Sequence, residues 1–126
     1  MKIRDLIVNE SHVPWVSSKR WPMDKTEIRY LISEQISPDL SFGIAKLESG
    51  GVHLLHHHRK EAEVYYIIKG RAKVILNTEQ VEVCPGTAIY LPPELRHKIV
   101  NTGNESLVLA WAYNIPMSYE NLVWDE

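Results

Sequence analysis

The chain has 126 residues, of which 44% are hydrophobic and 24% are charged, a composition typical of a single folded domain. Its formal net charge is −2 and its lysines and arginines are scattered, so we expect neither a nucleic-acid partner nor a membrane partner. The single cysteine, Cys84, excludes an intrachain disulfide and favours a reducing compartment. No signal-peptide core or membrane-spanning run is visible, so the expected location is the cytoplasm.

Short β-branched and aromatic stretches separated by turn residues predict strands along most of the chain. In chain order, the predicted strands cover residues 27–33, 40–49, 63–69, 71–77, 81–84, 87–91, 97–101 and 106–113. The last of these, SLVLAWAY, is apolar throughout, and we expect both of its faces to be buried. Seven or eight short strands at this spacing predict an all-β fold, either a sandwich or a closed barrel.

The two ends of the chain carry only weak helical signals. One short turn is predicted at 3–8 and another at 117–123, where Ser118 is a suitable N-cap. We expect one domain over 1–126, with a barrel core of about 27–113, an N-terminal arm of 1–26 and a C-terminal tail of 114–126. The arm is rich in proline and tryptophan, and it either wraps the barrel or pairs with a neighbouring chain.

The stretch HLLHHHRKEAEVYY, residues 53–66, holds four of the six histidines. Side chains alternate along a strand, so His56 and His58 share one face. Glu63 opens the next strand, about 5 Å away, and can bring a carboxylate to the same cation. His97 begins another strand and can add a third imidazole from across a barrel. This set suits Fe, Mn, Ni, Co, Cu or Zn and leaves coordination positions open for a substrate.

The spacing of these residues resembles the two motifs of the cupin superfamily, in its small single-domain form. The first motif is matched by Gly50, His56, His58, Glu63 and Gly70, and the second by Gly86, Pro92, His97 and Asn101. One position departs, because Glu94 stands where the second motif has its second glycine. The resemblance implies a double-stranded β-helix, a jelly-roll barrel, with His56, His58, Glu63 and His97 around one divalent metal.

Tyr65 follows Glu63 by two residues and therefore shares its inward face. Two roles stay open for it: a barrel-lining aromatic whose hydroxyl finds a partner, or a general acid or base beside the metal. We expect His53 at the surface and His57 on the outward face of its strand. Tyr90, Trp111 and Tyr113 lie on presumed core strands and are expected to be structural.

Small cupins include lyases, isomerases, decarboxylases, dioxygenases and binding modules, so the fold alone does not fix the reaction. A more distant resemblance to cupin-type dimethylsulfoniopropionate lyases places Tyr65 at their proton-abstracting tyrosine. Those lyases use a second tyrosine near the C-terminus, where the nearest candidates here are Tyr119 and Trp124.

The leading hypothesis is a metalloenzyme for a small polar metabolite, such as a carboxylate or sugar acid. It would combine metal Lewis-acid chemistry with general-base chemistry. One alternative is a non-catalytic binding or sensing module in which the metal anchors a ligand or stabilises the barrel. Another is a structural barrel without metal. Small cupins commonly dimerise, so we also expect a homodimer, with Trp15 and Trp21 near the contact.

Overall fold

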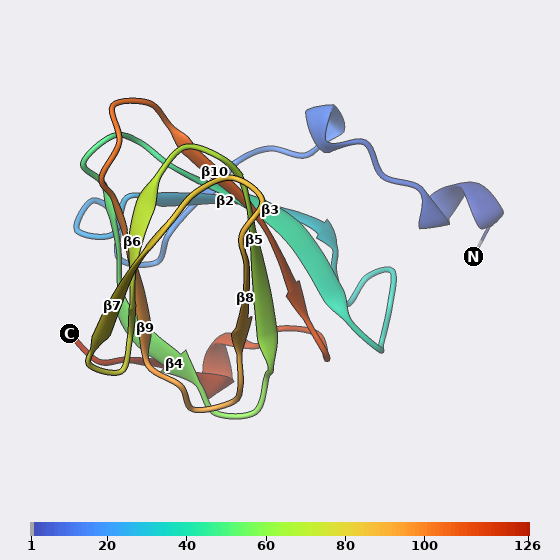
Figure 1. Cartoon of the computed structure of the whole chain (residues 1–126). Helices are drawn as coiled ribbons and strands as arrows, with labels where there is room; N and C mark the ends of the chain where they lie inside the picture. The colour runs from blue at the N-terminus through green and yellow to red at the C-terminus, as the bar shows by residue number, and fades with distance from the viewer. Residues whose placement is uncertain (1) are drawn as a thin grey trace.

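Two antiparallel β-sheets face each other around a common interior in the computed structural model, which describes residues 2–126 (Figure 1). One sheet has six strands in the order β1-β2-β3-β10-β5-β8, and the other has five in the order β11-β4-β9-β6-β7. The strands are β1 Val16–Ser17, β2 Thr26–Ile32, β3 Ser41–Leu47, β4 Val52–His58, β5 Glu63–Lys69, β6 Ala72–Leu76, β7 Glu79–Val83, β8 Ala88–Leu91, β9 His97–Asn101, β10 Leu107–Tyr113 and β11 Leu122–Trp124.

From β3 onward the chain crosses repeatedly from one sheet to the other, as a double-stranded β-helix does. The predicted all-β jelly-roll fold is therefore confirmed, and each of the eight predicted segments overlaps a strand. The short edge strands β1 and β11 were not predicted. The predicted helical turns are present as the 3₁₀ helices η1 (Ile3–Leu6) and η3 (Tyr119–Asn121), and η2 (Glu10–His12) is an addition. Among residues 2–126, no helix has the length and apolar character needed to cross a bilayer.

Strand β10 lies between β3 and β5 and supplies much of the core. Its inward side chains, Leu107, Leu109, Trp111 and Tyr113, are buried, whereas the alternate residues are only half-buried. The expectation that both faces of this strand are buried was therefore wrong. The reason is that residues 2–126 cover the outer face of the six-stranded sheet only in part.

That outer surface is nevertheless apolar. Phe42 of β3, three side chains of β5 and one of β8 point outward and are exposed; we call Phe42, Val64, Tyr66, Ile68 and Tyr90 the outer apolar face. Tyr90 was expected in the core but is 63% exposed, because its strand places Ile89 and Leu91 inward instead. Along β5, buried inward and exposed outward side chains alternate from Glu63 to Ile68, as expected of a strand with one face in the core.

The C-terminal tail holds the loop that joins β4 to β5. Strand β11 pairs with β4, and the backbone N–H of Arg59 donates to the carbonyl of Asn121 at 2.8 Å. Within the same loop, Glu61 is buried and accepts a hydrogen bond from the Ser118 N–H at 2.9 Å. This loop separates His58 from Glu63, so the tail helps to fix their relative positions.

Glu94 occupies the turn before β9 with a φ of +72°, in the left-handed region that favours glycine. Its backbone N–H donates to the carbonyl of His58 at 2.7 Å, which ties the turn to β4. The turn geometry of the second motif is thus kept although the glycine is missing. An L-residue with a Cβ is strained in this conformation.

Replacing Glu94 with glycine should therefore stabilise the protein by about 1 kcal/mol, because the strain disappears and the backbone hydrogen bond stays. Chemical unfolding at neutral pH would measure the change. Glu82→Gly, at an exposed position within β7, is the control and should be destabilising. A Glu94→Gly protein that is no more stable than the wild type would show that this turn carries no strain.

Candidate metal centre

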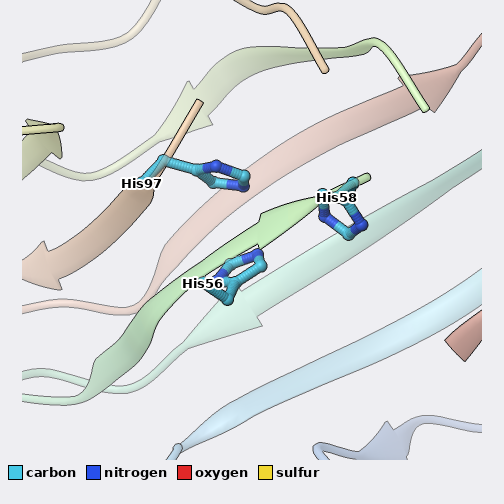
Figure 2. Close-up of side chains that lie close together, drawn as sticks. All are labelled: His56, His58 and His97. Carbon is cyan, nitrogen blue, oxygen red and sulfur yellow. The ribbon is translucent and has the colours of Figure 1, made fainter. Parts of the chain in front are cut away.

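Three histidines meet inside the barrel (Figure 2). His56 and His58 come from β4 and His97 comes from β9, where His97 is the cross-strand partner of His56. All three are buried, and one ligand atom from each lies within 4.8 Å of the others. The structure thus brings together the three imidazoles that the sequence predicted to share a site.

Backbone hydrogen bonds fix the orientation of two of these rings. The Nδ1 atoms of His56 and His97 lie 2.7 and 2.9 Å from the carbonyl oxygens of Leu54 and Leu95. A carbonyl oxygen only accepts, so each Nδ1 must carry the proton and donate it. The Nε2 lone pairs are then free, and holding a histidine by its other nitrogen in this way is how proteins prepare it for a metal.

Glu63 approaches the same cluster from the first residue of β5. Its Oε1 lies 3.5 Å from His58 Nε2 and 3.4 Å from His97 Nε2. Burial opposes ionisation of this carboxyl, but its interactions with the two imidazoles outweigh burial and hold the pKa of Glu63 at about 2. The side chain is therefore an anion at neutral pH, aimed at the histidines.

The donor atoms have the properties expected of metal ligands. Among residues 2–126, Glu63 Oε1 and His97 Nε2 are buried and have no hydrogen-bond partner. Buried polar atoms are rarely left unpaired, and a cation between them would satisfy both. Three imidazoles and one carboxylate form a mixed nitrogen and oxygen set that fits a divalent transition metal. The residues thus fit the predicted group, and Glu63 remains the predicted fourth ligand.

His56 is already in the protonation state that a ligand needs. Burial, followed by the neighbouring imidazoles of His53, His97 and His58, lowers the pKa of His56 well below its ordinary value. The ring is therefore neutral at physiological pH. No energy is needed to remove a proton from it before a cation binds.

A pocket of about 490 Å³, counting the solvent at its open side, lies between the two sheets beside the cluster. Glu63, Tyr65 and Tyr113 line it together with apolar side chains from both sheets. The Tyr113 hydroxyl lies 3.3 Å from His58 Nε2, and the ring of Tyr65 meets that of His97 edge to face at 5.8 Å between centroids. Tyr65 thus faces inward beside the cluster, which agrees with both of the roles left open for it.

His53 is the residue that the sequence misplaced. It was expected at the surface, but its side chain is only 17% exposed and lines the pocket. The pairing of β4 with β9 is irregular between His53 and His56, and this break in the alternation turns both rings into the interior. Their centroids lie 4.3 Å apart. Nothing in the sequence signals such an irregularity.

Asp24, which the sequence did not single out, holds His53 in place. Its Oδ2 accepts hydrogen bonds from His53 Nδ1 at 2.7 Å and from the Leu54 N–H at 2.9 Å. Burial would raise its pKa, but the interactions with His53 and the hydrogen bond from the Thr26 backbone N–H outweigh it and lower the pKa of Asp24 to about 2. His57, by contrast, points outward and pairs with Asp125 Oδ2 at 2.8 Å, which confirms its predicted orientation.

Removing His97 should abolish tight binding of Zn²⁺ or Mn²⁺, measured by isothermal titration calorimetry at pH 7.5. Since His97 is a predicted metal ligand, the loss of affinity should exceed the ~10–100-fold typical of losing a partner outside the ligand set. His57→Ala, on the same strand as His56 but facing away, is the control and should bind normally. Affinity in the wild type should fall as pH drops, because protons compete for the imidazoles. Equal binding by His97→Ala would place the cation elsewhere.

Asp24→Asn tests the Asp24–His53 pair through stability. The pKa of Asp24 in the folded protein, about 2, lies below the ordinary value of 3.8. The ionised form therefore contributes stability above pH 5 that is lost as pH falls toward 2. The wild type should exceed the variant by about 2 kcal/mol at pH 7 and by about 1 kcal/mol at pH 3 in urea unfolding. Asp39→Asn, at an exposed position, should show no such difference. A stability difference between the wild type and Asp24→Asn that does not narrow as pH falls would contradict the stabilising role of ionised Asp24.

Comparison with known proteins supports the geometry. Residues 43–113 match the cupin domain family. An uncharacterised protein of Methanocaldococcus jannaschii is 36% identical over 97 residues, which cover 72% of this chain and 78% of that protein. The glucose-6-phosphate isomerase of Thermococcus kodakarensis is 35% identical over 100 residues, 69% of this chain but 53% of the isomerase. The chain thus spans about half the length of the isomerases that it matches.

Solved structures share the fold. A predicted oxalate decarboxylase from Thermotoga maritima superposes with a TM-score of 0.75 at 26% identity, covering 86% of this chain and 98% of that one. KdgF from a Halomonas species gives a TM-score of 0.73 at 21% identity, covering 90% and 96% respectively. With the family match spanning more than half of the sequence and the histidine cluster in the interior of the barrel, this chain belongs to the cupin family.

Proposed function

We propose that this protein is a metal-dependent enzyme that moves a proton on a small, oxygen-rich metabolite, such as a carboxylate, a sugar or a sugar acid. The observation that carries the proposal is that Glu63 Oε1 and His97 Nε2 are buried without a hydrogen-bond partner among residues 2–126, beside a pocket that Glu63 lines. His56, His58, His97 and Glu63 would hold one divalent cation of the group Fe, Mn, Ni, Co, Cu or Zn. When bound, such a cation supplies Lewis-acid polarisation of substrate oxygens.

Tyr65 is the proposed catalytic hydroxyl. Burial, with added effects of the Glu63 and Asp24 carboxylates, raises the pKa of Tyr65 well above its ordinary value. The hydroxyl therefore keeps its proton at neutral pH. It is suited to donate a hydrogen bond or a proton to a substrate oxygen, which favours the general-acid role over the general-base role.

His53 is a candidate for the complementary role of proton acceptor. Because Asp24 accepts a hydrogen bond from Nδ1, the Nε2 atom is left as the acceptor of the neutral ring. No residue among 2–126 hydrogen-bonds to Nε2, and the ring lines the pocket. A carboxylate that orients an imidazole in this way fixes the tautomer needed for proton transfer.

The relatives support this class of reaction. Several archaeal proteins that are 31–35% identical to this chain are glucose-6-phosphate isomerases. Isomerisation of an aldose to a ketose requires proton transfer next to a carbonyl group, which a tyrosine donor and a histidine acceptor beside a cation can perform. We therefore favour an isomerase, with lyase and dioxygenase activities as further candidates for the same site.

A panel of sugars, sugar phosphates, sugar acids, dicarboxylates and diketones tests the proposal on protein loaded with one metal at a time. Tyr65→Phe should lower kcat by about 10²–10⁴-fold and leave metal affinity unchanged, since it removes a proton donor and no ligand. Tyr66→Phe is the control, because Tyr66 follows on the same strand but faces outward.

Turnover that is indifferent to Tyr65→Phe would remove Tyr65 from the mechanism. Thermal shifts with panel compounds in the absence of any turnover would instead establish the alternative of a binding or sensing module. A melting temperature that chelators and added metals leave unchanged would favour a barrel that needs no metal.

We further propose that a second copy of the chain covers the outer apolar face. The first part of the N-terminal arm, with η1 and η2, extends away from the barrel, and Ile3, Leu6 and Ile7 on it are exposed (Figure 1). The rest of the arm lies on the barrel, where β1 pairs with β2. Among residues 2–126, the chain thus has both an exposed apolar sheet face and an exposed apolar N-terminal segment. An isologous dimer would bury both at once.

Light scattering after size exclusion should give twice the 14.6 kDa of one chain for the wild type. Ile68→Lys, in the middle of the outer apolar face, should shift the mass to that of a monomer, because a charge would be buried at the contact. Lys73→Glu, a charge change in the opposite sheet, should leave the dimer intact. A monomeric wild type at micromolar concentration would rule out this assembly.

A further inference from the structure

Trp111 carries a buried hydrogen-bond donor that the proposed chemistry does not use. The side chain is only 4% exposed, and its Nε1–H has no hydrogen-bond partner among residues 2–126. Trp111 lines the same pocket as Glu63 and Tyr65. Since buried N–H groups are almost always paired, this donor indicates a place for an acceptor that the protein itself does not supply.

Packing fixes the direction of this donor. A Cβ added at Gly43 would lie 2.2 Å from Cζ2 of Trp111, so only glycine lets the indole lie against β3. Tyr30 meets the indole edge to face at 5.5 Å between centroids, and Tyr113 packs against it at 5.3 Å. The ring cannot turn to find another partner without disturbing these contacts.

The ring of Tyr113 lies between the indole of Trp111 and the histidine cluster. Tyr113 contacts both Trp111 and His58, with its centroid 5.1 Å from that of His58. A ligand whose one end reaches the histidines can therefore extend along the pocket toward the indole. Thr26 also lines this pocket, and its buried Oγ1 has no hydrogen-bond partner in the described part of the chain.

The pocket offers no positively charged side chain to the end of a ligand that would lie near Trp111. Lys46 is the only lysine or arginine among the lining residues. Its strand directs it to the outer face, and its ammonium lies over Trp15 at 4.4 Å from the ring centroid. The carboxylate of Glu63 adds negative charge nearby. A phosphate placed here would be desolvated without a cationic partner, which is unfavourable.

We infer that Trp111 is a specificity-determining residue whose indole N–H donates a hydrogen bond to an uncharged oxygen of the substrate. The site therefore selects unphosphorylated polyhydroxy compounds over their phosphate esters. This inference rests on the proposed function, because it assumes that the other end of the ligand binds at the histidine cluster. It goes further in naming the chemistry of the distant end. A hydroxyl or carbonyl group there satisfies the buried donor and needs no counter-charge.

The test uses full-length, Zn²⁺-loaded protein and three probes that share an α-hydroxycarboxylate end: glycolate, gluconate and 6-phosphogluconate. Calorimetry gives the affinities, and ¹⁵N-correlated NMR follows the indole N–H signals of the four tryptophans. We expect gluconate to bind about five- to tenfold tighter than glycolate, as one added hydrogen bond allows, and tighter than 6-phosphogluconate. Gluconate, but not glycolate, should shift the Trp111 indole signal.

Trp111→Phe assigns that signal and should remove the advantage of gluconate over glycolate while Zn²⁺ affinity stays the same. Trp15→Phe is the matched control, since Trp15 packs under Arg29 and Lys46 and does not line the pocket. If Trp111→Phe does not fold, the affinities of the three probes for the wild type still test the inferred selectivity, because that comparison needs no variant.

Equal binding of glycolate and gluconate, or tighter binding of 6-phosphogluconate, would overturn this inference and leave the proposed function intact. Failure of all three probes to bind the Zn²⁺-loaded protein would overturn the inference together with the carboxylate part of the proposed function. Failure to bind Zn²⁺ at the cluster would remove the basis of both.

Discussion

The hydrogen bonds from His56 and His97 to backbone carbonyls are the constraint on which the rest of this site depends. Each bond places the proton on Nδ1 and leaves the Nε2 lone pair in the barrel interior. The acceptors belong to residues two positions earlier in the chain, so His56 is oriented by its own strand and His97 by the turn that leads into β9. Burial then keeps His56 neutral, while Glu63 supplies the negative charge that a divalent cation needs. The electrostatics of the pocket follow from these few contacts.

The barrel positions these residues through the register of β4 against β9 and through an irregularity in that pairing. Pairing of β4 with β9 sets His56 opposite His97, and the break in that pairing brings His53 to the same side as His56. The loop between His58 and Glu63 is held by the C-terminal tail, and the turn before His97 is tied to the carbonyl of His58. Elements far apart in sequence thus fix the positions of the proposed ligands. Tyr65, the Asp24-held imidazole of His53 and the indole of Trp111 line the pocket beside them.

Much of this could be predicted from the sequence because period-two alternation and motif spacing are local properties. They predicted the strands, the shared face of His56 and His58, the inward Tyr65 and the outward His57. The position of His53 could not be predicted, since it depends on an irregular strand pairing that leaves no mark in composition. Asp24 lies in an irregular segment, so its contact with His53 is visible only in three dimensions. Tyr90 was misplaced because its short strand has apolar residues on both faces, and alternation alone does not decide which face is inside.

The central claim is that three imidazoles and one carboxylate from this chain surround a single divalent cation. X-ray absorption spectroscopy of protein loaded with one equivalent of Zn²⁺ tests it most directly. The account predicts a first shell of about three imidazole nitrogens at roughly 2.0–2.1 Å and oxygen ligands at roughly 2.0–2.2 Å. The His97→Ala protein should lose one of those imidazoles. A spectrum with oxygen ligands only, or one that His97→Ala leaves unchanged, would contradict the account.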